Sequence, residues 1–254
     1  MPTPRSEPIR VVVAGEDRTH QFLLARLIRS LPGTQGWRLE GLDLQSDFYK
    51  ISRAKADAKK AGIRTTGRVK GKPRSPEAVL FLRVRLLAQE AGATGVVVLR
   101  DSDNDEGLLG DAARLNEEGI DWQPYAAFGV AHRDAEGWLL AGYTAQGDDE
   151  RIRLQQAKKW LSFNPTREPE RLTAQPNDAD TDAKRVLAFI LGEGTELTGK
   201  GRAPSRPPTD DDLASMAAGL AGVNDLAAFE NCGAAAFVAA LRALASRLGA
   251  PTSP

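Results

Sequence analysis

Residues 96–107 have the sequence Val96-Val97-Val98-Leu99-Arg100-Asp101-Ser102-Asp103-Asn104-Asp105-Glu106-Gly107. An apolar, β-branched run that follows a glycine and ends abruptly in acidic residues is typical of a strand buried on both faces of a parallel sheet. In open α/β sheets the ligand crevice lies outside the carboxyl ends of the strands. The stretch therefore predicts an α/β fold whose sheet has an acidic carboxyl edge.

The alternating acids of this stretch favour a metal site. Asp101 and Asp103 can point the same way and share a hard divalent cation, Mg²⁺ or Mn²⁺, which takes oxygen ligands. Two carboxylates this close repel each other unless a cation or a proton lies between them. Asp105 is a further, peripheral ligand candidate. The alternative is an acidic turn that caps the next helix, with Asp105 or Asn104 at the N-cap.

The first part of the chain alternates strands and helices. Strands are expected at residues 9–14, 37–44, 96–100 and 122–130, and helices at residues 19–31, 76–91, 106–118 and 132–141. This alternation predicts a mostly parallel sheet with helices on both faces.

After Gly142 the pattern changes to helices without obvious strands. They are expected at residues 151–163, 181–191, 213–220 and 226–248. We therefore expect an α/β domain at residues 1–145 and a helical C-terminal extension at residues 146–254. The acidic triplet at residues 210–212 suits a helix N-terminus, where the macrodipole favours negative charge.

The charge of the chain is balanced, with 34 basic and 34 acidic residues, but it is unevenly distributed. Residues 50–74 hold ten basic residues and one acid, Asp57, whereas residues 101–121 hold eight acids and one base. We expect residues 50–76 to form an exposed excursion that cannot build core, with a possible helical start at residues 53–61. Its cations suit the phosphate backbone of a nucleic acid. The contacts predicted are Lys55, Lys59, Lys60, Arg64, Arg68, Lys70, Lys72 and Arg74.

Composition excludes several other classes. The single cysteine, Cys232, cannot form an intramolecular disulfide and lies among alanines, so we expect it to be a buried small hydrophobe. Two histidines and one cysteine do not favour a closed zinc site. Without a leader-like segment or an apolar run of about 20 residues, the sequence predicts a cytoplasmic location and no membrane contact.

The ordered motifs resemble the TOPRIM domain of topoisomerases, primases and OLD-type nucleases. The resemblance rests on a first strand that ends in a glycine turn with an acid, a basic middle segment and a later Asp-x-Asp. Three further segments resemble a small TOPRIM-like family, the DUF4276 proteins, often encoded in antiphage-defence loci. They are residues 132–141 with Glu136, residues 169–187 with Pro169-Glu170 and Lys184-Arg185, and Asn231-Cys232-Gly233 followed by Phe237 and Leu241.

The resemblance implies a metal-dependent nuclease that hydrolyses DNA or RNA, with DNA preferred, and a possible partner ATPase. It implies that Asp101 and Asp103 are the principal metal ligands and that Glu16 completes the site as a ligand or as a general acid or base. Glu136 would reach the same edge, and Lys184 would contact the phosphate or offset charge at the leaving oxygen. In each case the alternative is a solvated side chain on a helix.

One position departs from the family pattern. The family places a glutamate directly before the first glycine, where this chain has Ala14. Glu16 and Asp17, just after Gly15, are the nearest substitutes. The departure favours a second hypothesis, a catalytically inactive scaffold of the same fold that binds nucleic acid or a partner ATPase. A third hypothesis is a phosphoacceptor receiver-like domain, but no convincing lysine ends a later strand.

Overall fold

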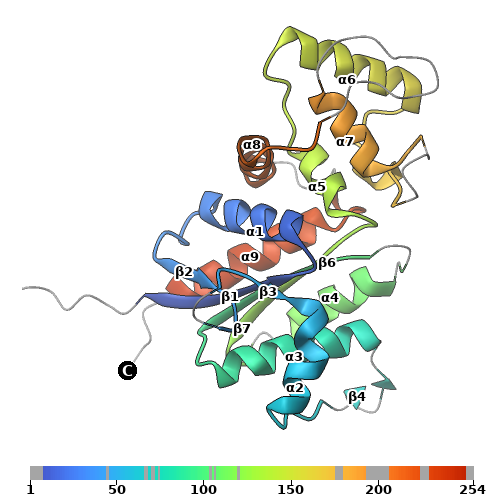
Figure 1. Cartoon of the computed structure of the whole chain (residues 1–254). Helices are drawn as coiled ribbons and strands as arrows, with labels where there is room; N and C mark the ends of the chain where they lie inside the picture. Colours follow the sequence, from blue (N-terminus) through green and yellow to red (C-terminus); the bar gives the residue numbers. More distant parts are fainter. Residues whose placement is uncertain are drawn as a thin grey trace, which may run out of the picture.

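The computed structural model describes residues 8–43, 46–65, 68–69, 72–73, 75–102, 105, 107–118, 121–174, 180–192, 206–223 and 229–249. Its central feature is one sheet between two layers of helices (Figure 1). The strands of this sheet are β1 (Ile9–Gly15), β2 (Trp37–Glu40), β3 (Tyr49–Lys50), β6 (Gly95–Asp101) and β7 (Tyr125–Ala131).

All pairings within this sheet are parallel. The strand order is β2-β1-β6-β7, and β3 also pairs with β1, at Ala14 and Gly15. All strands therefore end at the same edge, which places the residues after β1, β6 and β7 beside one another. The predicted α/β fold with a parallel sheet is confirmed.

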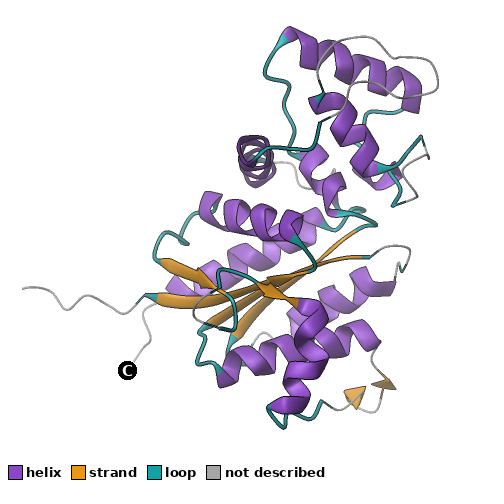
Figure 2. Ribbon diagram, in the orientation of Figure 1, coloured by secondary structure: helices purple, strands orange, loops and turns teal. Residues whose placement is uncertain are grey.

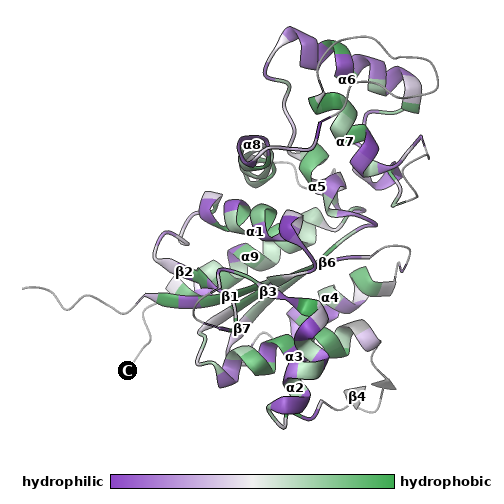
Figure 3. Ribbon diagram, in the orientation of Figure 1, coloured by the Kyte–Doolittle hydropathy of each residue, from purple (hydrophilic) through white to green (hydrophobic). Residues whose placement is uncertain are grey.

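The two faces of the sheet follow from the alternation of side chains along each strand. On β1, Val11 and Val13 join the core on the face covered by α1 (Arg18–Ser30). Val12 and Ala14 join the opposite core, which includes residues of α3 (Pro76–Glu90) and α4 (Gly107–Glu118). Figure 2 shows these helical layers on either side of the strands. Because both faces are covered, the middle parts of β1, β6 and β7 are apolar, whereas β2 and β3 also hold charged residues (Figure 3).

The C-terminal part is helical, as expected. The α/β domain ends with α5 (Ala135–Ala141), and the described residues of the extension form α6 (Asp148–Leu161), the 3-10 helix η2 (Pro169–Arg171), α7 (Ala183–Leu191), α8 (Asp210–Gly222) and α9 (Ala234–Gly249). This extension is the C-terminal part. It shares its core with the sheet, because α9 packs on β7 beside α1 and places Phe237 directly over Gly129. The acidic triplet forms the first turn of α8, where Thr209 and Asp212 make a capping box.

Some predicted boundaries were wrong. The second strand ends at Glu40 instead of residue 44. The last helix begins at Ala234 rather than residue 226, because Gly233 has a φ of +82° and lies against the Val130 carbonyl. Residues 224–228 lie outside the described residues.

The expectation that the basic excursion adds nothing to the core was also wrong. It contains η1 (Ile51–Arg53), α2 (Ala54–Lys60) and an antiparallel pair of strands, β4 (Arg68–Val69) and β5 (Lys72–Pro73). Ala54 and Ala58, four residues apart, are fully buried in the core that contains α3. Small alanines on one face of α2 therefore anchor it. Among the described helices, none combines the length and apolarity needed to cross a membrane.

Candidate functional site

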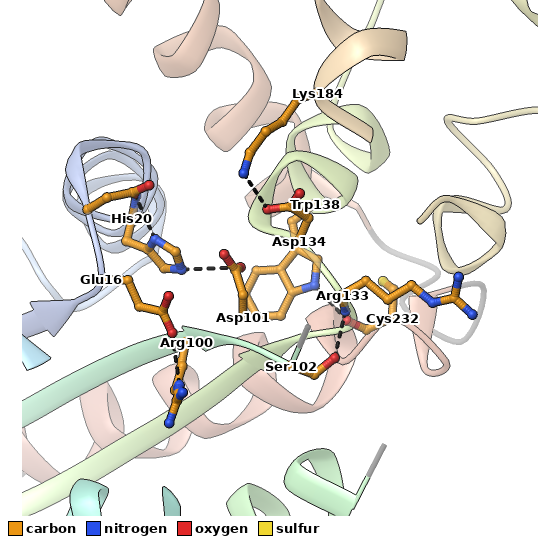
Figure 4. Close-up of polar contacts among 11 residues, drawn as sticks. Glu16, His20, Arg100, Asp101, Ser102, Arg133, Asp134, Trp138, Lys184 and Cys232 are labelled. Carbon is orange, nitrogen blue, oxygen red and sulfur yellow. Dashed lines mark hydrogen bonds and ion pairs between the residues drawn. The ribbon is translucent and has the colours of Figure 1, made fainter. Parts of the chain in front are cut away.

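The carboxyl ends of three neighbouring strands bring acidic side chains together (Figure 4). Glu16 follows β1, Asp101 ends β6, and Asp134 lies in the turn after β7. In the register of the sheet, Asp101 stands opposite Ala131. Asp101 and Asp134 are buried. Two of the three acids at this edge are therefore largely removed from water, while Glu16 stays partly exposed.

His20 lies at the centre of this edge. Asp17 is the N-cap of α1, and its Oδ1 accepts hydrogen bonds from the His20 backbone N–H at 3.2 Å and from Nδ1 at 2.9 Å. The Nε2 of His20 is 3.3 Å from Oδ1 of Asp101, an ion-pair contact whose geometry is not that of a hydrogen bond. The side chain of His20 is 1% exposed. Its ring is thus enclosed between two carboxylates.

This enclosure changes the acid–base behaviour of both histidine and aspartate. Burial alone would lower the pKa of His20, but the contacts with Asp101 and Asp17 outweigh it and raise the pKa to about 10. The hydrogen bond from His20 lowers the pKa of Asp17 to about 2. At neutral pH the ring is therefore an imidazolium, which partly neutralises the edge.

Glu16 and Asp101 have raised pKa values. For Glu16 the causes are burial and the nearby charge of Asp101, opposed by His20 and by Arg100, whose Nε donates to Glu16 Oε1 at 2.9 Å. For Asp101 the main cause is burial, opposed by the contact with His20. Both carboxylates would gain from a bound cation, because a positive charge stabilises their ionised forms.

A second polar cluster adjoins the first. Lys184, on α7, places its Nζ 3.2 Å from Oδ1 of Asp134, immediately before α5. Glu136, on α5, is buried, and burial together with the charge and hydrogen bond of Asp134 raises its pKa to about 9. Burial would lower the pKa of Lys184, but Glu136 and Asp134 raise it. At neutral pH this cluster holds a protonated carboxyl group beside a charged ammonium.

The turn between β7 and α5 is held by hydrogen bonds. Arg133 has a left-handed backbone, with φ of 67°, and its N–H donates to Ser102 Oγ at 2.7 Å. Its side chain points away from Asp101 (Figure 4), and its Nε donates to His132 Nε2 at 3.2 Å. On α5, Trp138 Nε1 donates to the carbonyl of Cys232 at 2.7 Å. As predicted, Cys232 is buried; burial raises the pKa of its thiol to about 12.

The structure brings four of the predicted site residues to one edge: Glu16, Asp101, Glu136 and Lys184. Asp103 lies outside the described residues. Asp105 is exposed, and its Oδ1 accepts the N–H of Gly107 at 3.0 Å where α4 begins, which is the capping contact of the alternative interpretation.

Sequence reasoning missed His20 and Asp134. For His20 a signal existed, because Asp17 stands three residues before it at the start of a predicted helix. Its contact with Asp101, 81 residues away in the chain, had no local signal. For Asp134 the signal was its place directly after a predicted strand, at the edge where the other acids gather.

The donor chemistry of this edge fits Mg²⁺ or Mn²⁺. Glu16 and Asp101 offer carboxylate oxygens, which are the ligands that these hard cations prefer. Oδ1 of Asp101 is buried and faces Nε2 of His20, which leaves Oδ2 as the oxygen that a cation could reach. Within the described ranges, no three His, Cys, Asp or Glu side chains are grouped so that they could hold a metal ion. A complete site would therefore need a further oxygen donor, and Asp103 is the candidate that follows Asp101.

The basic segment begins at the same edge, because Lys50 of β3 pairs with Gly15 of β1. Among the predicted nucleic-acid contacts, Lys55, Lys59, Lys60 and Arg64 are exposed. The Nζ of Lys60 is 3.8 Å from Asp57 Oδ1. Arg68 lies in β4 and Lys72 in β5, while Lys70 and Arg74 lie outside the described residues.

Comparisons of this chain with protein-family models, with curated proteins and with solved structures found no match.

Proposed function

We propose that this chain is a metal-dependent nuclease with a TOPRIM-like domain, acting on DNA or RNA as a subunit of an antiphage-defence system. The observation that carries the proposal is the convergence of Glu16, Asp101 and the Glu136–Lys184 cluster on one edge of a parallel sheet. Phosphodiester hydrolysis needs an activated water, charge stabilisation at the phosphate and a proton for the leaving oxygen. The side chains of this edge suit all three needs.

The placement of the family-like segments supports the TOPRIM-like assignment. Pro169 of η2 packs near Gly137 of α5, since a Cβ on Gly137 would lie 3.7 Å from the Pro169 carbonyl oxygen. Lys184 reaches the residue before α5, and Trp138 of α5 bonds to Cys232. Segments that resemble the DUF4276 family at three separate places in the sequence thus adjoin a single helix.

In the proposed mechanism Asp101, Asp103 and Glu16 hold Mg²⁺ or Mn²⁺, with Asp105 as a peripheral ligand. The bound cation supplies charge stabilisation and lowers the pKa of water. Lys184 places positive charge near the scissile phosphate. Glu136 keeps its proton at neutral pH and can donate it to the leaving oxygen.

The basic segment supplies the substrate contacts in this proposal. Exposed lysines on α2 neutralise backbone phosphates, which binds a nucleic acid without reading its sequence. We propose DNA rather than RNA as the preferred substrate, and an ATPase as a possible partner. Because β3 connects α2 to the end of β1, a strand bound along this segment would pass close to the acidic edge.

The second candidate is an inactive scaffold of the same fold. It is favoured by the cations that already engage the two carboxylates, Arg100 at Glu16 and His20 at Asp101. Ala14, buried in the core where the family has a glutamate, also favours it.

Calorimetric titration with Mn²⁺ separates the two candidates. We expect the wild type to bind Mn²⁺ and expect Asp101→Asn and Asp103→Ala each to abolish binding with the fold intact. Asp148→Asn removes a carboxylate from the exposed start of α6 and serves as the control, with unchanged affinity. A wild type without Mn²⁺ binding, or equal affinity in Asp101→Asn, would refute the metal site and favour the scaffold.

A further inference from the structure

We propose that Asp17 and His20 form a positioning relay that orients Asp101 for its ligand. The inference rests on the proposed function in taking that ligand to be Mg²⁺ or Mn²⁺. Asp17 holds the Nδ1 side of the ring, and the Nε2 side faces Oδ1 of Asp101. The relay therefore fixes one carboxylate oxygen of Asp101 and leaves the other, Oδ2, for the cation.

The three residues of the relay differ in burial, and the histidine between the two carboxylates is the most enclosed. The Asp17 side chain is 57% exposed, that of Asp101 is 12% exposed, and His20 between them is almost fully buried. Asp17 is thus fixed at the surface as the N-cap of α1, and His20 links it to the buried carboxylate of Asp101. A carboxylate that holds one ring nitrogen of a histidine fixes the orientation of the ring, and carboxylates that bind metals are in turn held by neighbouring polar groups.

The backbone at the end of β1 is shaped to admit the ring. A Cβ on Gly15 would lie 2.7 Å from the Cβ of His20 and 3.0 Å from the ring of Phe48. Only a glycine at position 15 allows α1 to start this close to β1. His20, the third residue of α1, therefore lies at the carboxyl edge of the sheet. The buried position of His20 therefore depends on the absence of a side chain at Gly15.

A purely structural role accounts poorly for His20. Enclosing an imidazole costs desolvation, and an apolar side chain would fill the same space without that cost. The other buried residues of α1 are leucines and an isoleucine, which pack on the sheet. His20 alone faces Asp101, so the ring acts on the carboxylate.

Substitutions of the exposed Asp17 test the relay without disturbing the core. Serine caps helices as well as aspartate does, but it is shorter and has no carboxylate to hold Nδ1. Asparagine keeps both the cap and an oxygen that can accept from Nδ1. We expect Asp17→Ser to weaken Mn²⁺ binding by about tenfold to 100-fold, as removal of supporting residues behind metal ligands does. Asp17→Asn should bind Mn²⁺ close to wild type. Both variants lose the charge that Asp17 places beside His20, so both should melt below the wild type with the fold retained.

Proton exchange of the imidazole provides a readout that needs no metal. The chain has only two histidines, so His132→Gln identifies the signals of His20 in a nitrogen-edited NMR spectrum. In the wild type and in Asp17→Asn, the ring N–H protons of His20 should exchange slowly with water, and in Asp17→Ser they should exchange fast.

The outcomes separate the relay from the proposed function. If the wild type binds Mn²⁺ and Asp17→Ser binds it equally well, the relay is wrong and the metal site stands. If Asp17→Ser binds Mn²⁺ more tightly, His20 competes with the cation, which also overturns the relay. Fast exchange of the His20 ring protons in the wild type would contradict it without reference to metal. Absence of Mn²⁺ binding in the wild type would refute the metal site and the relay together.

Discussion

At the scale of single residues, burial decides what the acids of the edge can do. Glu136 has an ordinary pKa of 4.5, which rises to about 9 in the folded chain. The folded state therefore binds the proton of Glu136 more tightly than the unfolded state does. It follows that the stability contributed by this group is complete below about pH 4.5 and is lost as the pH rises towards 9.

Replacement of Glu136 by glutamine tests the direction of this pH dependence of stability. Glutamine resembles the protonated acid and cannot ionise, so Glu136→Gln should be more stable than the wild type at pH 8 and nearly equal to it at pH 4.5. The gain at pH 8 should be about 1 kcal/mol or more, roughly 2–4 °C in Tm for a chain of this size. Thermal melts at the two pH values measure it, and an equal effect at both would show that Glu136 is ionised in the fold.

The residues of the site were predictable to the extent that they follow strands. Asp101 and Glu16 stand directly after apolar runs, and the rule for parallel sheets places such residues at one edge. The partners of these acids were not predictable. His20 faces Asp101 because α1 packs against the sheet at a particular depth, and that depth depends on Gly15 and Phe48 rather than on any local pattern.

At the scale of elements, close backbone contacts decide where helices begin and cross. The bounds of β1, β6, α1 and α3 were predicted nearly to the residue, because the apolar periodicity and the caps of each element lie within a few residues of each other. The start of α9 was misplaced because alanine-rich sequence continues past Gly233, whose positive φ ends the preceding turn. In a single sequence, a glycine that adopts positive φ cannot be distinguished from one that does not.

The crossing of α5 and α8 gives a prediction at this scale. A Cβ on Gly219 of α8 would overlap the backbone carbonyl of Gly142 at the end of α5, and a carbonyl of packed backbone cannot move aside. Gly219→Ala should cost about 1–3 kcal/mol. Gly222→Ala, on the same helix with nothing within 4 Å, should be neutral or slightly stabilising. Denaturant unfolding compares the two, and equal stability would show that this crossing is loose.

At the scale of the whole molecule, the balanced net charge conceals an acidic edge at the ends of the strands and a basic segment that begins beside it. The basic segment was predicted as a solvated loop, and its anchoring by Ala54 and Ala58 could not be foreseen because two alanines give a weak apolar signal. The folded α2 presents its lysines on a fixed helix rather than a mobile loop. This arrangement suits repeated phosphate contacts along one strand.

Salt dependence of DNA binding tests the surface. Charge reversal of Lys55 and Lys59 on α2 should weaken binding for all DNA sequences alike and lower the slope of log affinity against log salt by about 2. The matched control reverses Arg151 and Lys159, exposed cations of α6, and should leave the slope unchanged. An unaltered slope in the α2 variant would show that this helix does not contact the backbone phosphates.

The central claim is metal-dependent phosphodiester hydrolysis at the carboxyl edge of the sheet, and the most direct test is a cleavage assay. The substrates are supercoiled plasmid and single-stranded DNA, with Mn²⁺ or with a chelator. We predict cleavage by the wild type with Mn²⁺ only, none by Asp101→Asn, and a rate about 10²- to 10⁴-fold lower for Glu16→Gln with DNA binding retained. A wild type that binds Mn²⁺ and DNA yet cuts neither substrate, or Asp101→Asn that cuts at the wild-type rate, would contradict the claim.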